Sequence, residues 1–113
     1  MNTIILIGRL TRTVDIRNTS TGKKIAEFSL AVNKNKETTF FFNCTAWEKT
    51  AELLQNYTVK GDKVGIEGEL QSEKYTKKDG TIATKTFILV TQVELLAERK
   101  EGNIDTQNVS TPF

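Results

Sequence analysis

Hydrophobic and polar residues alternate along most of this chain, and a period of two predicts β-strands. The stretch 11–22 is polar and ends in a cluster of turn-forming residues, so we expect a loop there. Asp79-Gly80 tolerates positive φ and predicts a hairpin turn. The chain is therefore expected to be mainly β. The expected strands cover residues 2–10, 24–33, 38–46, 63–70 and 82–96.

One segment has a different period. Trp47, Ala51, Leu54 and Tyr57 recur at steps of three and four residues with polar residues between them, which predicts an amphipathic helix over 47–57. Five strands with a single helix between the third and the fourth match the five-stranded oligonucleotide-binding (OB) barrel. The alternative is a generic small β-barrel without a ligand.

The strand that contains three consecutive phenylalanines carries the strongest functional signal. Side chains alternate between the two faces of a strand, so the even-numbered residues of 40–47, including Cys44, form a face suited to a core. The odd-numbered residues place Phe41 and Trp47 on the opposite face, and Tyr75 precedes the Asp79-Gly80 turn. Exposed rings near lysines are typical of single-stranded nucleic-acid binding. Alternatively, Phe41 and Trp47 cover a subunit interface.

Basic residues are interleaved with these rings and surround the expected loops. Each one alone would be an ordinary solvated charge, but together they predict a positively charged groove with stacking platforms and little sequence preference. The candidate phosphate contacts are Arg9, Arg12, Arg17, Lys34, Lys36, Lys49, Lys74, Lys77, Lys78 and Lys85.

Composition narrows the class of protein. A chain of 113 residues suits one domain, and 16 basic against 14 acidic residues give a net charge of only +2, so the clustering of cations must carry the electrostatic argument. There is no histidine and only one cysteine, so we expect no zinc site, no cofactor and no histidine-based catalysis. Cys44 is expected to be a buried structural thiol. The pattern indicates a binding protein and not an enzyme.

No apolar run approaches the length of a membrane span, and the first apolar run is interrupted by Gly8 and Arg9. It lacks the basic region and the cleavage site of a signal peptide. We therefore expect the protein to be cytoplasmic.

Several short motifs occur in the order seen in the bacterial and phage single-stranded DNA-binding proteins, and the chain resembles that family from residue 1 to about 96. The motifs are Ile4-Ile5-Leu6-Ile7-Gly8-Arg9-Leu10, Phe28-Ser29-Leu30-Ala31-Val32-Asn33, Trp47-x-Lys49-x-Ala51-Glu52, Tyr57-x-x-Lys60-Gly61 and Ile66-Glu67-Gly68-Glu69-Leu70.

This resemblance implies a homotetramer of OB barrels that wraps single-stranded DNA in replication, recombination and repair. It implies stacking on Phe41, Trp47 and Tyr75. It adds Lys60 to the basic positions, together with Arg17, Lys49 and Lys74. One stacking position of the family falls near Lys36 here, which replaces a ring with a charge.

The strand pattern ends at Ala97 and the residues after it are polar, so we expect an OB domain over 1–97 and a flexible tail over 98–113. Family members usually end in several acidic residues followed by Pro-Phe. This chain keeps Pro112-Phe113, which we expect to contact replication or recombination proteins, but Asp105 is the only acidic residue near them. The alternative is an inert tail.

The resulting hypothesis is a non-enzymatic protein that coats and protects single-stranded DNA. Two other classes stay open: a barrel used only for protein interaction, and an RNA-binding barrel of the cold-shock type. A nuclease is the least favoured class, because the carboxylate cluster that would bind a metal is missing.

Overall fold

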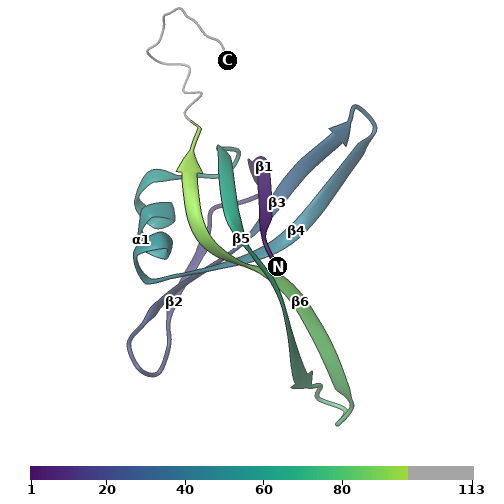
Figure 1. Ribbon diagram of the computed structural model, residues 1–113. Coiled ribbons are helices and arrows are strands. Elements are labelled where there is room, and N and C mark those ends of the chain that lie inside the picture. The colour runs from purple at the N-terminus through teal and green to yellow at the C-terminus, as the bar shows by residue number, and fades with distance from the viewer. Residues whose placement is uncertain (97–113) are drawn as a thin grey trace, which may run out of the picture.

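We analysed a computed structural model of the chain, which describes residues 1–96 (Figure 1). The expected tail 98–113, with Pro112 and Phe113, lies outside the described residues. In the described range the elements are β1 (Ile4–Leu10), β2 (Asp15–Asn18), β3 (Lys24–Asn35), β4 (Thr38–Trp47), α1 (Glu48–Tyr57), β5 (Lys63–Thr76) and β6 (Ile82–Leu95).

Five of these strands close a mixed barrel. Strand β1 pairs with β5 along most of its length and with β3 at its end, β5 pairs with β6, and β6 runs parallel to β4. Helix α1 connects β4 to β5, which are the third and fourth barrel strands. The prediction of an OB fold with one helix between the third and fourth strands is confirmed. No helix within residues 1–96 is long and apolar enough to cross a membrane.

The prediction of a loop over 11–22 was wrong in part, because this segment contains β2. Strand β2 forms a hairpin with β3, in which Arg17 lies opposite Ile25, and the turn is closed by hydrogen bonds between Thr19 and Lys23 and from Gly22 N to Thr19 O. Strand β2 has only four residues, and three of them are the polar Asp15, Arg17 and Asn18, so it is too short and too polar to show an apolar alternation.

Besides the short β2–β3 hairpin, two longer hairpin arms extend from the barrel, one formed by β3 and β4 and the other by β5 and β6 (Figure 1). The second arm is longer than the sequence predicted, because the ladder continues from Leu70↔Ile88 to Thr76↔Ile82. The expected Asp-Gly turn closes it: the Asp79 carboxylate accepts a hydrogen bond from the backbone N–H of Thr81 at 3.0 Å. Backbone hydrogen bonds between β5 and β6 thus stabilise this polar arm, which has no apolar alternation.

The core lies inside the barrel under α1, where Ala51 and Leu54 of the helix are fully buried with Leu30 and Val64. Cys44 is 2% exposed, as expected. Phe40, in contrast, was predicted to face the core and is 44% exposed. It lies on the β3–β4 arm opposite Val32, beyond the region where β4 pairs with β6, so no barrel strand covers it.

By parity, Phe87, Leu89, Val93 and Leu95 share one face of the last strand, but this face is not buried along the whole strand. Ile88 and Val90 of β6 point into the core, in place of Phe87 and Leu89. The pairing shifts between Glu67↔Gln92 and Gly68↔Val90, so Thr91 is an extra residue and reverses the alternation. Gly68 is required at this bulge because a Cβ there would collide with the carbonyl oxygen of Leu89.

Candidate nucleic-acid interface

The three predicted stacking rings all lie on the surface of the barrel and its arms. Phe41 is 65% exposed, Trp47 38% and Tyr75 48%. Phe41 lies on the β3–β4 arm, Trp47 ends β4 next to α1, and Tyr75 lies on the β5–β6 arm. The alternation within β4 therefore directs Phe41 and Trp47 outward while Cys44 and Ala46 are buried, as the sequence indicated.

A cleft of about 310 Å³ lies on this outer face, where strands β2 to β6 present their outward side chains. Its floor contains Ile25, Phe87 and Leu89, and its rim includes the Trp47 ring and the charged side chains of Arg17 and Lys85, among others. Rings and cations that are far apart in the sequence thus meet in one depression.

Two neighbouring hollows extend this cleft. One shares Glu27, Thr45, Lys85 and Phe87 with it and reaches Arg12. The other shares Thr19 and Trp47 with the cleft and continues along the β2–β3 turn to Lys23. We call the three adjoining depressions, from Arg12 through Lys85 and Trp47 to Lys23, the outer groove.

The cations of the outer groove are held by neighbouring side chains. Arg17 Nη2 lies 3.1 Å from Glu27 Oε2, and Arg12 Nη2 lies 3.4 Å from Asp15 Oδ2. The hydrogen bond from Arg17 lowers the pKa of Glu27, and the same bond raises the pKa of Arg17. Both pairs are exposed, so they orient the guanidinium groups more than they stabilise the fold.

Lys85 has a different partner. Its Nζ lies 5.7 Å from the centroid of the Phe87 ring, a cation–π arrangement across the floor of the cleft. The ring itself is only 7% exposed. The ammonium group is therefore positioned directly above an aromatic surface.

The structure distributes the remaining predicted cations over four other places, three of which are the tip of the β3–β4 arm, helix α1 and the β5–β6 arm. Lys34 and Lys36 lie at the tip of the β3–β4 arm, Lys49 lies in the first turn of α1, and all three are exposed. Exposed lysines also line the β5–β6 arm and its turn. These are Lys74, Lys77 and Lys78.

Arg9 and Lys60 lie apart from the outer groove. The Arg9 guanidinium donates a 3.0 Å hydrogen bond to the carbonyl oxygen of Gly61, in the loop between α1 and β5. Lys60 is exposed in the same loop. Neither residue lines the three depressions described above.

Sequence reasoning missed the floor of the cleft. Neither Phe87 nor Ile25 was singled out from the sequence, yet both are buried on the outer side of the barrel. One available signal was Lys85 two residues before Phe87, because residues at that spacing share a strand face and a lysine does not fit a core.

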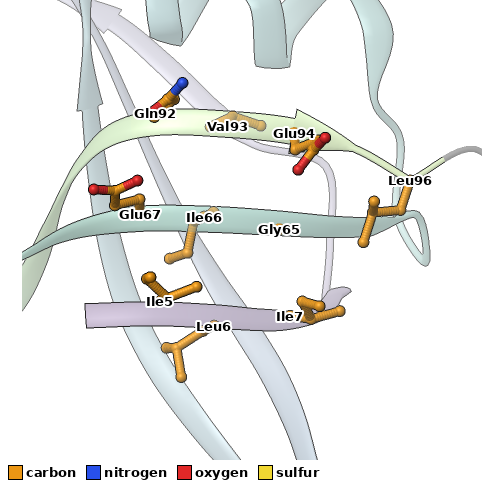
Figure 2. A pocket seen from close by; sticks show the side chains of 10 residues that line it. All are labelled: Ile5, Leu6, Ile7, Gly65, Ile66, Glu67, Gln92, Val93, Glu94 and Leu96. Atoms are coloured by element: carbon orange, nitrogen blue, oxygen red, sulfur yellow. The ribbon is translucent and has the colours of Figure 1, made fainter. Parts of the chain in front are cut away.

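A second apolar surface lies on β1 (Figure 2). Its lining residues differ from all of those that line the outer groove. Ile5 is 71% exposed and Ile7 55%, and both line a hollow with Gly65 of β5 and Glu94 of β6. Residues 4–8 of β1 pair with β5 alone among the strands of the described range, so one edge of β1 offers free backbone groups.

Comparisons with known proteins agree with this geometry. Residues 1–96 match the model of the single-strand binding protein family. The chain belongs to this family. It is 39% identical over 108 residues to a single-stranded DNA-binding protein of Bacillus cereus, with 90% of this chain and 64% of that protein covered.

Two further relatives show the same likeness. A protein named single-stranded DNA-binding protein 2 from Listeria monocytogenes is 35% identical, with 93% of this chain and 69% of that protein covered. One from Oceanobacillus iheyensis is 37% identical, with 94% and 70% covered. The chain spans less than two thirds of the Bacillus cereus relative and 63% of one from Bacillus anthracis. Membership in the single-strand binding protein family therefore concerns the barrel described above.

Proposed function

We propose that this protein binds single-stranded DNA with little sequence preference and protects it during replication, recombination and repair. The observation that carries the proposal is the exposure of Phe41, Trp47 and Tyr75 on the outside of an OB barrel whose outer groove contains Arg17 and Lys85. Membership in the single-strand binding protein family and the names of its relatives support the same ligand.

Two forces would supply the binding free energy. Each base that stacks on an exposed ring contributes about 1–3 kcal/mol. Each phosphate that meets a cation releases condensed counterions, so affinity falls as salt rises. Duplex DNA keeps its bases paired and stacked, so it offers the rings no free faces and binds more weakly. This is a binding activity, and it uses no catalytic group.

Titration of Trp47 fluorescence tests the proposal, because the chain has only one tryptophan. Oligo-dT is expected to quench the emission, whereas a duplex of equal length quenches it only at much higher concentration. Equal affinities for oligo-dT and duplex would overturn the proposal. A competition with oligo-U separates DNA binding from RNA binding, since the 2′-hydroxyl distinguishes the two ligands.

We further propose that the protein is a homotetramer. The exposed side chains of Ile5 and Ile7, together with the unpaired edge of β1, support self-association through this strand. The number of four subunits rests on the family resemblance. Light scattering with and without a dT oligomer measures the subunit number and the stoichiometry together.

We also propose that the protein is cytoplasmic and that Pro112-Phe113 contacts replication or recombination proteins. Both proposals rest on the sequence features and on the resemblance, and no described residue bears on them. Deletion of Phe113 from the full chain is expected to abolish capture of a replication or recombination protein and to leave DNA binding intact.

A further inference from the structure

The floor of the outer groove is an apolar surface that does not belong to the barrel core. Ile25 is 5% exposed and Phe87 7%, but both lie outside the cluster of residues that fills the barrel. Ile25 pairs with Trp47 across β3 and β4, and Phe87 pairs with Gln71 across β5 and β6. Directly opposed residues share a face, so these side chains point to the groove.

We propose that this cleft binds one unpaired nucleobase, in addition to the three exposed stacking rings, and that it favours cytosine over thymine. The proposal rests on the proposed binding of single-stranded DNA. The cleft, at about 310 Å³, lies at the lower end of the range for ligand sites, which suits a single small planar group. Phe87 supplies a ring at its floor and Trp47 a second ring at its rim.

The position of Lys85 above Phe87 explains how the ring becomes available for stacking with a base. Lys85 Nζ lies 5.7 Å from the ring centroid in the free protein, and the lysine is otherwise exposed. A phosphate at the groove attracts this ammonium group, and a base then takes its place on the ring. Lys85 thus covers the apolar floor in the absence of DNA and neutralises a DNA phosphate when DNA is bound.

The polar groups of the rim indicate which base fits. The Glu27 and Glu73 carboxylates and the Gln71 side chain line the cleft. Glu27 is already bonded to Arg17 through Oε2, whereas Glu73 lies on β5 directly opposite Lys85. A carboxylate accepts a hydrogen bond from the amino group of cytosine and repels the O4 carbonyl of thymine.

The decisive experiment measures dissociation constants of dT and dC oligomers of equal length for the full chain and its variants. Phe87→Leu keeps an apolar floor but removes the ring, and it should weaken binding of both oligomers about tenfold. Phe42→Leu makes the same change on the inner face of β4 and serves as the control. Binding of a folded Phe87→Leu variant within about twofold of wild type overturns the proposal.

The base preference is tested by the ratio of the dT and dC dissociation constants. A change of net charge affects both oligomers alike, and the difference in intrinsic stacking cancels when the ratio is compared between variants. Glu73→Ala should shift this ratio about fivefold towards thymine. Glu52→Ala removes an equal charge from helix α1 and should leave it unchanged. The same ratio in wild type and Glu73→Ala overturns the preference for cytosine. If neither oligomer binds wild type, the proposed function itself fails.

Phe87 is buried, so its variant could fail to fold. Photocrosslinking of the unaltered protein with an oligomer that carries one 5-iodocytosine avoids this difficulty. Mass spectrometry is expected to find crosslinks on the β6 peptide that contains Phe87. Crosslinks confined to Phe41 and Tyr75, which do not line the cleft, overturn the proposal.

Discussion

Arg17 Nη2 lies 3.1 Å from Glu27 Oε2 at the rim of the outer groove, so this cation already has an anionic partner before DNA arrives. The pair is exposed, and the hydrogen bond from Arg17 holds the pKa of Glu27 below its usual range. The carboxylate is therefore ionised at neutral pH. A DNA phosphate must compete with Glu27 for the guanidinium group.

Glu27→Gln should strengthen binding of single-stranded DNA, because the neutral amide leaves the full charge of Arg17 to a phosphate. We expect affinity to rise about threefold at moderate salt and the slope of log K against log salt to steepen by about 0.7, the value for one more phosphate contact. Glu52→Gln makes the same change of net charge on α1 and controls for it. A slope that is equal in both variants would show that removal of the Glu27 charge adds no phosphate contact.

The exposed rings permit a comparison within one strand. Phe41→Ala should weaken binding by about 1–3 kcal/mol, and Tyr75→Ala by a similar amount, because each removes one stacking surface. Phe40 is 44% exposed on the opposite face of the same arm, so Phe40→Ala should leave the affinity unchanged. Fluorescence titration at one salt concentration measures all three. If Phe41→Ala disrupts the oligomer and spares binding, the ring belongs to a subunit interface.

Association through β1 is tested by comparing two exposed isoleucines, Ile7 on β1 and Ile82 on the β5–β6 arm. Ile7→Asp places a charge where we expect a subunit to pack, so light scattering should give a smaller assembly. Ile82 is 72% exposed at the tip of the β5–β6 arm, and Ile82→Asp is the control. A full-size assembly with Ile7→Asp would exclude this surface as the interface.

Much of the fold follows from the sequence because alternation is a strong signal wherever one face of a strand is buried. On that basis the sequence correctly predicted that Phe41 and Trp47 lie on the exposed face of β4 and Cys44 on its buried face. The helix was recognisable since its buried positions, Ala51 and Leu54, keep the spacing of one helical face.

The misassigned faces have equally physical causes. A bulge at Thr91 reverses which side of β6 is buried, and a bulge depends on the pairing partner and leaves no mark in the strand's own pattern. Phe40 has the parity of a core residue but lies on an arm beyond the barrel. The bulge also hid the floor of the cleft, because it decides which face of β6 carries Phe87.

The buried thiol gives a prediction for alkaline pH. Burial raises the pKa of Cys44 to about 12, above the ordinary 9.0 of a cysteine. A group whose pKa is raised on folding contributes stability below its unfolded value and loses it as the pH rises towards the folded value. Between pH 9 and 12, the free energy of unfolding should therefore fall more steeply for wild type than for Cys44→Ala.

The same burial should make the Cys44 thiol unreactive. At pH 8, iodoacetamide should modify the native protein at least about a hundredfold more slowly than the urea-unfolded chain, because the thiolate is the reactive form. Mass spectrometry of quenched samples measures both rates. Equal rates would mean that the thiol is accessible in the folded barrel.

Glu48 lies at the junction of β4 and α1 and has a φ of 54°, in the left-handed region that a side chain with a Cβ disfavours. It follows Trp47, which caps the helix without a side-chain hydrogen bond. Glu48→Gly and Glu48→Ala both remove the carboxylate, so their difference contains only the backbone strain that glycine relieves and the backbone entropy that glycine loses on folding. We expect the glycine variant to be more stable by about 1 kcal/mol, since the left-handed conformation costs a residue with a Cβ roughly 1–2 kcal/mol.

The matched pair at Gln55, an exposed position in the interior of α1, should give the opposite sign. There Gln55→Gly should be less stable than Gln55→Ala by about 0.5–1 kcal/mol, because glycine loses more backbone entropy in a helix. Urea unfolding of the four variants provides the comparison. If glycine is destabilising relative to alanine at both 48 and 55, the backbone at Glu48 is not strained. The conformation of Glu48 then does not determine where the Trp47 ring lies.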